Sequence, residues 1–591
     1  MEYSKHKDLP PSETIKRAQT ILKSLKLEWK ETLNHPSTNL YSTRLEIINL
    51  GWGTNGKGTT EEYCRASAYG EMLERLQNLH LPDSLMETIS DYANKYRNFK
   101  FYPDESSVTL ERILTEFVDL KEDMQKSFFE SDKRLPSDKE LYDIWRKWND
   151  NKDSFTSIPF YSARKKKVQN LPIEIIRRLC RSNGIASGNS FDEALCQALS
   201  EIIERHALEV IFTKQLTPPT IQKDFIKKHS PELHNTIMEI EGKGPFNIIV
   251  YDASLGEQLP VVCVVFIDRL EQKYRIKLGC HPLFNIALER CLTELGQGCD
   301  FTIESNKKFL TPLSLTDIDE WDTLKNWSGM FRSNHGHIPL CFFYGEPSWT
   351  FHAWESIENY NNHIGAKKMM EICLNITNDI YIRDNSFLGF PCVRVYAPKI
   401  TPVYKFNPLG NAHMLDKRII RTLQHFPLHA QNLSNEEKQQ IYSIFKNDYH
   451  TIYTEGLGIS LPVLLGAINA DLGNYDTALY YLRRENQPSL FIKAAIKELE
   501  MITKDINVSD RNCILTSFFG AKYKVYIELN WRQGNIVGGL FDPFRLKSRI
   551  NSIANSKSVS TNITVSNLIV LLKDKMCEEI LDQISVSKHF D

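Results

Sequence analysis

The chain has 591 residues, enough for roughly two to four domains at about 150 residues each. Apolar residues make up 41% and charged residues 25%, which is typical of folded proteins and excludes long disorder. The formal net charge of −2 gives no general electrostatic reason to bind nucleic acid or an anionic membrane surface.

Further classes of protein are excluded by local features. The longest apolar run, Leu259–Ile267, is far shorter than the roughly 20 residues of a membrane-spanning helix. The polar start, residues 1–8, shows no secretory signal. None of the twelve cysteines forms a C-x-x-C pair, so a disulfide framework, a zinc ribbon or an iron–sulfur cluster is not expected. We expect a reduced, cytoplasmic protein without nucleic acid or membrane partners.

The first part of the chain predicts a mixture of elements. Residues 12–34 have the pattern of one amphipathic helix, and residues 43–50 resemble a strand that runs into the glycine-rich segment 51–58. Residues 59–76 predict a second helix. Residues 80–155 lack a clean period and are interpreted as a long insertion with short helices.

The middle of the chain alternates between helix and strand patterns. Helices are predicted at 191–215 and 285–298, with strands at 247–251, 260–266 and 274–279. Beyond about residue 415 the pattern is almost entirely helical. Residues 470–479 have the small-residue spacing of a tetratricopeptide hairpin, although generic helix packing explains them as well.

These patterns predict an α+β protein in three parts. They are an N-terminal helix at 1–40, an α+β domain at 41–405 that contains the 80–155 insertion, and an all-helical domain at 415–591.

The glycine-rich segment 51–58 (Gly-Trp-Gly-Thr-Asn-Gly-Lys-Gly) has the spacing of a dinucleotide fingerprint and nearly that of a P-loop. A P-loop needs Ser or Thr after its lysine, but Gly58 follows Lys57. A dinucleotide fold needs an acidic residue at the end of the next strand, but Glu71 falls within a predicted helix. The segment alone is therefore interpreted as a tight turn, with a nucleotide site as the alternative.

Three predicted helices carry a narrow polar stripe at i, i+4 and i+7 within largely apolar surfaces. The stripes contain Ser67, Glu71, Glu74 and Arg75 on the first helix; Glu193, Gln197, Ser200, Glu201, Glu204 and Arg205 on the second; and Arg290, Glu294 and Gln297 on the third. A solvated face explains any one stripe. Three narrow stripes in one domain favour helices that direct these side chains inward.

Carboxylates that share a buried space are stable only with cations. Magnesium bound by carboxylates usually brings phosphate oxygens with it, and Arg75, Arg205 and Arg290 are suited to the same phosphates. The residues alone therefore predict a magnesium–nucleotide site without a Walker loop.

Five segments also carry a family resemblance: Thr54–Gly58, Ser67–Arg75, Asn183–Arg205, Tyr251–Gly256 and His281–Gln297. In order and spacing they resemble the motifs of the YcaO family, over residues of about 40 to 400. The length and the helical C-terminal part are similar to those of full-length members of this family. The resemblance implies a YcaO-like α/β core followed by a helical C-terminal domain.

The resemblance implies an ATP- and Mg2+-dependent enzyme that activates a backbone amide of a peptide or protein by phosphorylating its oxygen. Loss of phosphate then leaves an azoline, a thioamide or an amidine. The implied magnesium ligands are Glu71, Glu201, Glu204 and Glu294. The implied ATP contacts are Lys57, Ser67, Glu74, Arg75, Asn189, Glu193, Gln197 and Arg290. No catalytic base is identified.

Two departures place azoline formation in doubt. The chain ends Ser-Val-Ser-Lys-His-Phe-Asp, without the proline-rich tail of many azoline-forming members, and no peptide-recognition module related to ubiquitin-activating enzymes is visible. Some members are accessory factors for β-methylthiolation of a ribosomal protein, and the family frequently dimerises. A ribosomal protein substrate, a partner held by the C-terminal helices and a homodimer are therefore expectations.

Two other classes of protein remain open: an ATP-binding scaffold without backbone chemistry, and a small-molecule ligase.

Five single residues have interpretations of their own. His206 is interpreted as structural, His281 as structural or acid–base, Asp252 as stabilising a turn, and Cys196 and Cys291 as buried inert thiols.

Overall fold

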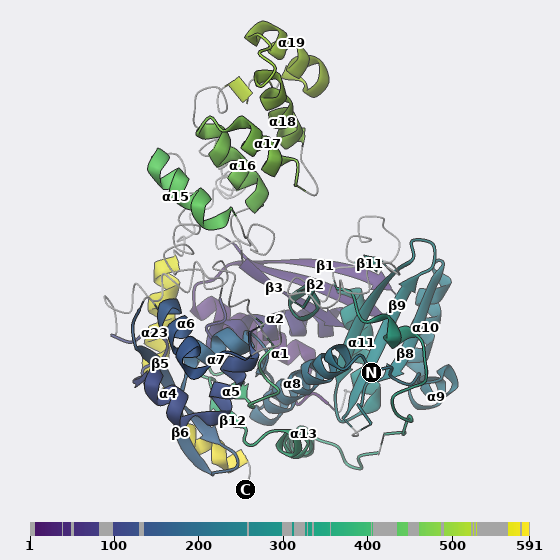
Figure 1. The fold of residues 1–591 in the computed structure, drawn as a ribbon. Coiled ribbons are helices and arrows are strands. Elements are labelled where there is room, and N and C mark those ends of the chain that lie inside the picture. Colours follow the sequence, from purple (N-terminus) through teal and green to yellow (C-terminus); the bar gives the residue numbers. More distant parts are fainter. Residues whose placement is uncertain are drawn as a thin grey trace. The chain divides into compact units, whose positions relative to one another are not determined.

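The computed structural model divides the chain into two compact units, each described here by itself (Figure 1). The first comprises Met1–Tyr142, Asp153–Phe406 and Asn562–Asp591, and the second comprises Asp143–Lys152 and Asn407–Thr561. The structure describes residues 6–37, 39–48, 52–81, 98–128, 135–149, 151–256, 259–297, 310–312, 326–327, 329–333, 336–354, 356–403, 405, 434–446, 460–485, 490–521, 524, 527–528, 565–579 and 582–589.

The described residues of the first unit form three antiparallel sheets. One has the order β1 (Trp29–Ser37), β2 (Leu40–Ile47), β3 (Trp52–Gly58). Another has the order β11 (Thr311–Pro312), β10 (Lys273–Cys280), β9 (Val261–Asp268), β8 (Phe246–Asp252). The largest has the order β4 (Ser106–Thr109), β5 (Ser154–Ser162), β12 (Tyr381–Asp384), β13 (Cys392–Tyr396), β7 (Ile185–Ser187), with β6 (Lys167–Pro172) also paired to β5.

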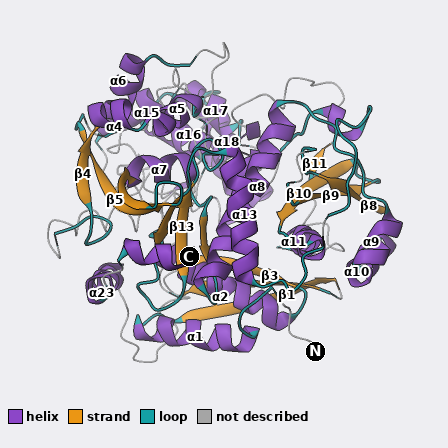
Figure 2. Cartoon of the chain, turned by 90° about the horizontal axis from the view of Figure 1, so that it is seen from below, coloured by secondary structure: helices purple, strands orange, loops and turns teal. Residues whose placement is uncertain are grey.

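Three helices connect these sheets. Helix α2 (Glu61–Gln77) packs on β2 and β3 and reaches β7 and β13 of the largest sheet. Helix α8 (Phe191–Thr213) contacts β7 and β13 on one side and β9 and β10 on the other, and it lies beside α13 (Asn362–Ile376) in Figure 2. Helix α11 (Phe284–Gly296) packs on β9 and β10 and also contacts β2 and β3. The three helices therefore meet where the three sheets come together.

The other helices described in this unit are α1 (Pro11–Ser24), α4 (Leu110–Glu116), α5 (Val118–Lys126), α7 (Ile173–Cys180), α9 (Lys223–His229), α10 (Pro231–Gly242) and α23 (Val565–Glu578), with short helices at Gly329–Ser333, Leu340–Phe343 and Gln583–His589. Helix α6 (Asp138–Trp148) begins in the first unit and ends in the second. The α+β class predicted from the sequence is confirmed. So are the helices at 59–76, 191–215 and 285–298 and the three strands β8, β9 and β10.

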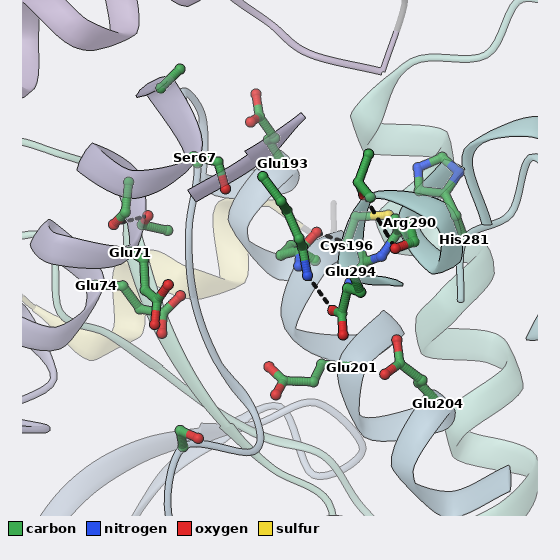
Figure 3. Close-up of a pocket in the computed structure, with 18 of the residues that line it drawn as sticks. Ser67, Glu71, Glu74, Glu193, Cys196, Glu201, Glu204, His281, Arg290 and Glu294 are labelled. Atoms are coloured by element: carbon green, nitrogen blue, oxygen red, sulfur yellow. Dashed lines mark hydrogen bonds and ion pairs between the residues drawn. The ribbon is translucent and has the colours of Figure 1, made fainter. Parts of the chain in front are cut away.

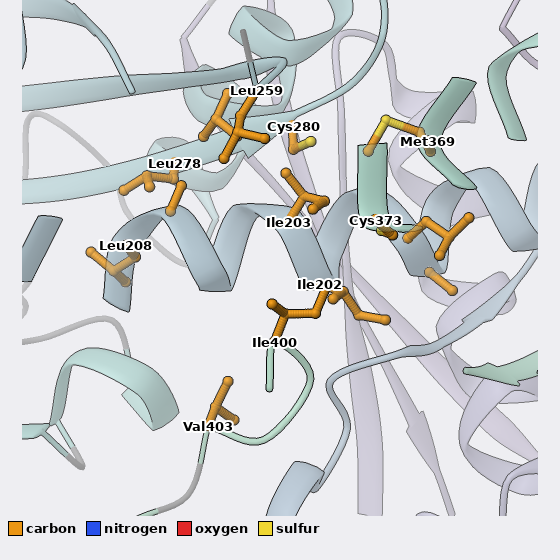
Figure 4. Close-up of a cluster of buried hydrophobic side chains, with 14 of the residues drawn as sticks. Ile202, Ile203, Leu208, Leu259, Leu278, Cys280, Met369, Cys373, Ile400 and Val403 are labelled. Carbon is orange, nitrogen blue, oxygen red and sulfur yellow. The ribbon is translucent and has the colours of Figure 1, made fainter. Parts of the chain in front are cut away.

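The apolar surface of α8 anchors it between the sheets. The cluster around it draws on α8, α13, β9, β10 and the segment after β13, and Figure 4 labels Ile202, Ile203, Leu208, Leu259, Leu278, Cys280, Met369, Cys373, Ile400 and Val403. Burying this surface is the main stabilising term for such a helix. It also fixes the direction in which the polar stripe of α8 points.

The prediction of one helix over residues 12–34 is wrong. Helix α1 ends at Ser24, and β1 begins at Trp29 and pairs antiparallel with β2. The helix closes in a Schellman motif: Leu27 N–H donates to Leu22 O and Lys26 N–H donates to Lys23 O, with Lys26 in the left-handed region at φ 54°. Glycine usually occupies the left-handed position that ends a helix. Because this chain has Lys26 there, the sequence did not show that α1 ends.

The interpretation of residues 51–58 as a tight turn is also wrong for the described residues 52–58, which form strand β3; Gly51 lies outside them. The glycines permit close packing of α2 on this strand. A Cβ on Gly56 would lie 1.9 Å from Cys64 O and 2.5 Å from Ala68 N, and one on Gly58 would lie 2.6 Å from Cys64 N. Residues 52–58 are thus a strand rather than a turn or a loop, and Lys57 within this strand stays a predicted ATP contact.

In the second unit the described elements are helices: α15 (Asn435–Phe445), α16 (Leu461–Asp471), α17 (Tyr475–Leu482), α18 (Leu490–Ile502) and α19 (Val508–Phe519). Helices α16 and α17 form a hairpin across Gly473, whose φ is 80°. Gly466 allows the two helices to approach, because a Cβ there would lie 2.5 Å from Leu482 Cγ. The hairpin at 470–479 is present, and its tetratricopeptide character stays a prediction.

The last segment of the chain packs on the first unit. Lys573 Nζ of α23 donates to Phe99 O at 2.6 Å, and the Gln583 side chain makes two hydrogen bonds to the backbone of Asp384. Residues 562–591 thus belong to the first unit, whereas the sequence patterns grouped them with the helical part. Among the described residues, no helix has both the length and the apolar character needed to cross a membrane.

A substitution can test the close packing of α2 on β3. Gly56→Ala is expected to lower the free energy of unfolding by about 1–3 kcal/mol, because the added methyl group must push the helix away from the strand. Gly242→Ala, at the end of α10 with nothing within 4 Å of the new Cβ, serves as the control and should be neutral or stabilising. Thermal unfolding followed by circular dichroism measures both, and equal effects would contradict this account of β3.

Candidate functional site

The polar stripes of α2, α8 and α11 line one cavity of about 610 Å3 (Figure 3). All twelve residues that the sequence analysis assigned to ATP or magnesium contribute to its wall: Lys57, Ser67, Glu71, Glu74, Arg75, Asn189, Glu193, Gln197, Glu201, Glu204, Arg290 and Glu294. The structure therefore brings the predicted residues together, and their roles as ligands stay predictions.

Helix α2 forms one wall. Its N-cap Thr60 accepts a hydrogen bond from Tyr63 N, which fixes where the helix begins and so which residues face inward. Arg75 Nη2 donates to Glu71 Oε1 at 3.0 Å, and Arg75 Nη1 lies 3.5 Å from Glu74 Oε1. Apart from this ion pair, the buried Nη1 has no hydrogen-bond partner among the described residues, so it keeps a donor suited to an oxyanion.

Helix α8 forms the opposite wall, beginning at its N-cap Ser190. Asn189 Nδ2 donates to both carboxylate oxygens of Glu193, at 3.3 and 3.1 Å. Two turns later, Arg205 Nη2 lies 3.9 Å from Glu201 Oε1. In Figure 3, Glu201 is drawn between Glu74 of α2 and Glu204.

Helix α11 closes the cavity. Arg290 Nη1 donates to Gln197 Oε1 at 2.5 Å, while Arg290 Nε is buried and has no hydrogen-bond partner in the described part of the chain. Glu294 accepts a hydrogen bond from Lys57 of β3, and Lys277 Nζ of β10 lies 3.9 Å from its other carboxylate oxygen. The cavity therefore joins residues from all three stripes with Lys57 from β3, while Lys277 of β10 lies behind Glu294.

Burial dominates the electrostatics of the site. It raises the pKa of Glu74 from 4.5 to about 8 and that of Glu204 to about 7, and the charge of Glu294 adds to the shift of Glu204. Burial also raises the pKa of Glu201. At Glu294 burial opposes ionisation, but the charges of Lys57 and Lys277 outweigh it and hold the pKa of that carboxyl below its ordinary value. A divalent cation would stabilise the charged form of the crowded carboxylates.

The N-terminal segment also lines the cavity, which the sequence analysis missed. Lys7 Nζ lies 3.1 Å from Glu193 Oε1, and Asp8 N donates to Glu193 Oε2 at 3.0 Å. Thr14 Oγ1 of α1 donates to Asn189 Oδ1 at 2.7 Å. These contacts join residues more than 170 positions apart, so no local pattern could have identified them.

His281 and Cys196 lie at one end of the cavity. Leu283 N donates to His281 Nδ1 at 3.0 Å, so Nε2 carries the ring proton and faces the Tyr360 hydroxyl at 3.1 Å. Cys196 Sγ is 3.8 Å from the same hydroxyl. Burial lowers the pKa of His281, and the nearby His6, Arg290 and Lys7 add to this, so the imidazole is neutral near pH 7.

Other candidate residues lie outside the cavity wall. His206 is not part of it. Asp252 accepts hydrogen bonds from Ser254 N and Oγ and from Trp349 Nε1, which is the turn-stabilising role predicted for it. Cys291 is buried and its Sγ contacts Val262 O, as expected for an inert thiol.

The donor set fits magnesium with a nucleotide better than magnesium alone. In the described residues no three His, Cys, Asp or Glu side chains are arranged to hold a metal ion by themselves. Several of the carboxylates form ion pairs instead, with Lys57, Arg75 and Arg205. The unpartnered donors of Arg75 and Arg290 are suited to phosphate oxygens, which would complete the set of oxygen ligands that magnesium requires.

Comparison with known proteins identifies the family. The family model for the YcaO cyclodehydratase, ATP- and Mg2+-binding, matches residues 55–401. The chain is 30% identical over 417 residues to the ribosomal protein S12 methylthiotransferase accessory factor YcaO of Escherichia coli, covering 69% of this chain and 67% of the relative. It is 28% identical over 414 residues to an uncharacterized protein of Haemophilus influenzae, covering 68% and 67%. The family description confirms ATP and Mg2+ as the predicted cofactors.

Solved structures that match part of this chain include a heterocyclase in complex with substrate and cofactor, at a TM-score of 0.46 and 16% identity. The match covers 67% of this chain and 53% of the heterocyclase, so the chain matches about half the length of that protein. Another is YcaO from Methanopyrus kandleri bound with AMPPCP and Mg2+, at a TM-score of 0.44 and 14% identity, covering 68% of this chain and 95% of that one.

The raised pKa of Glu74 predicts a pH-dependent effect of Glu74→Gln on stability without nucleotide. The unfolded carboxyl titrates near 4.5 and the folded one near 8, so between these values the native state retains a proton that the unfolded state has lost. Glu74 therefore contributes less stability as the pH rises through this window. From pH 5 to pH 8.5 the variant should gain on the order of 4 kcal/mol relative to the wild type.

Urea unfolding at the two pH values measures this difference. Glu111→Gln, which replaces an exposed glutamate of α4, is the control and should show no such gain. If the difference in the free energy of unfolding between Glu74→Gln and the wild type were the same at both pH values, the raised pKa of a buried Glu74 would be contradicted.

Proposed function

The chain belongs to the YcaO family, and on this basis we propose that it is an ATP- and Mg2+-dependent enzyme that activates a backbone amide of a peptide or protein. The observation that carries the proposal is the single cavity in which all twelve predicted ligand residues meet. The cyclodehydratase and thioamide-forming class is the reaction class that fits such a site.

We assign the residues by charge and position. Glu71, Glu201, Glu204 and Glu294 hold magnesium, which when bound neutralises charge on the transferred phosphoryl group. Arg75 and Arg290 line the cavity, each has a buried nitrogen without a hydrogen-bond partner among the described residues, and both contact the phosphates. The remaining ATP contacts are Lys57, Ser67, Glu74, Asn189, Glu193 and Gln197.

In the proposed reaction a nucleophile adds to the amide carbonyl, and the resulting oxygen anion attacks the γ-phosphorus of ATP. The bond to the β-phosphate oxygen breaks and ADP leaves. Elimination of inorganic phosphate, with loss of a proton, then gives the azoline, thioamide or amidine according to the nucleophile. The arginines stabilise the negative charge that develops during phosphoryl transfer. The catalytic base is not assigned.

The substrate we propose is a peptide or protein, with ribosomal protein S12 as the first candidate because the Escherichia coli relative is an accessory factor of the S12 methylthiotransferase. A cytoplasmic location, a homodimer and a partner bound by the helical second unit complete the proposal. The absence of a C-x-x-C or C-x3-C-x2-C pattern excludes the usual cluster motif of a radical methylthiotransferase.

A second candidate function is an ATP-binding accessory protein without backbone chemistry of its own. The accessory role of the Escherichia coli relative and the helical second unit favour it. Both functions use the same nucleotide site, so binding alone does not distinguish them.

Glu201→Gln tests the nucleotide site. The variant is expected to lose the Mg2+-dependent part of ATP binding in isothermal titration while keeping its fold, because removing one carboxylate lessens like-charge crowding. Glu209→Gln is the matched control, since this residue lies on the same helix but outside the cavity wall and should bind ATP normally. Normal Mg2+-dependent binding by Glu201→Gln would overturn the assignment.

ATP turnover distinguishes the functions. If the chain is the proposed enzyme, unmodified ribosomal protein S12 or another protein substrate should stimulate ATP hydrolysis and be altered in mass at a backbone amide. Stoichiometric binding of ATP and S12 without turnover would favour the accessory function. Turnover driven by a metabolite without any peptide would instead indicate a small-molecule ligase.

A further inference from the structure

Glu294 is held between two lysines that come from different sheets. Lys57, on β3, donates to Oε1, and Lys277, on β10, lies 3.9 Å from Oε2. Lys57 belongs to the predicted ATP contacts, whereas Lys277 has no role in the site as proposed. A lysine is almost never fully buried without a reason, and the side chain of Lys277 is only 4% exposed.

The geometry of β10 explains why Lys277 cannot leave Glu294. Side chains alternate along a strand, so Arg275, Lys277 and Gly279 share one face. This face lies against α11: Arg275 Nη1 donates to Leu295 O at 3.1 Å, and a Cβ on Gly279 would lie 2.3 Å from Ala287 O. Lys277 is therefore enclosed between β10 and the helix that carries Glu294, and it does not line the cavity.

Lys57 is placed differently. Its side chain is 25% exposed and lines the cavity, so it can turn from Glu294 toward a bound anion without unfolding any packed element. Lys277 is held by packing between β10 and α11, so it would stay beside Glu294 after such a movement. Its Nζ lies 3.9 Å from Glu294 Oε2, which is an ion pair longer than a hydrogen bond.

A divalent cation that approaches Glu294 in the free protein meets the ammonium group of Lys57 and, below a pKa that burial lowers to about 7, that of Lys277. At these distances like-charge repulsion is substantial, because the groups are shielded from water. Magnesium also loses its water reluctantly and favours sites that include phosphate oxygens. A nucleotide phosphate would attract Lys57 and add oxygen ligands at the same time.

From this arrangement we infer that Lys277 is a fixed countercharge of Glu294 and Lys57 an exchangeable one, so that together they keep divalent cations off this carboxylate until a nucleotide binds. Lys277 is a positioning residue, because it acts only through Glu294. The inference rests on the proposed nucleotide site. Its consequence is that metal and nucleotide enter together.

Binding of Mn2+ to the full-length protein tests the inference, with electron paramagnetic resonance of free Mn2+ as a readout that needs no turnover. Wild type is expected to bind Mn2+ at least about tenfold more tightly with AMPPCP than without it. Lys277→Met should tighten nucleotide-free Mn2+ binding by about tenfold while retaining AMPPCP binding. Lys57→Met should also tighten nucleotide-free Mn2+ binding, but it should weaken binding of AMPPCP.

Lys273→Met is the matched control, since it replaces another lysine of β10 that pairs with Glu271 and lies away from Glu294; it should behave as wild type. Lys277→Gln replaces the methionine variant if circular dichroism shows that the latter does not fold. Wild-type Mn2+ affinity that is equal with and without AMPPCP would overturn the inference, as would Lys277 variants identical to wild type. No AMPPCP binding by the wild type under any condition would instead refute the proposed nucleotide site.

Discussion

Crowding of carboxylates in a buried space is the constraint on which the rest of this structure depends. Glutamates from α2, α8 and α11 converge on one cavity, and burial raises the pKa of Glu74, Glu201 and Glu204. Such a cluster is tolerated only with cations beside it. Arginines on the same helices and lysines on the neighbouring strands supply them, so the cation positions are as much a part of the fold as the apolar core.

The backbone brings the three helices close enough for this to happen. Glycines on the strands remove the side chains that would keep the helices away, at Gly56 beneath α2 and at Gly279 beneath α11. The apolar surface of α8, packed between two sheets, fixes the third helix. The segments that resemble family motifs thus have two roles. Their polar side chains line the cavity, and their glycines set the distance between helix and strand.

The charges of the site differ in mobility as well as in sign. Lys277 is fixed by packing, whereas Lys57 and Lys7 reach the cavity from more exposed positions. A site built in this way can balance its carboxylates when empty and still exchange some of its cations for a ligand. This division matches a nucleotide site without a glycine-rich phosphate loop, because side chains replace the backbone N–H groups that such a loop would provide.

Local pattern in the sequence determined the helices of the three stripes, the strands β8 to β10 and ten of the twelve residues that meet in the cavity, because helical and strand periods specify which side chains share a face. The other two, Lys57 and Asn189, were implied only by the family resemblance. Local pattern failed where a lysine took the usual place of glycine at the end of α1 and where glycines served packing in β3. Only the tertiary structure could place Lys7 on Glu193 and Lys277 beneath Glu294. These contacts join distant segments, and no period within one helix or strand encodes the distance between two of them.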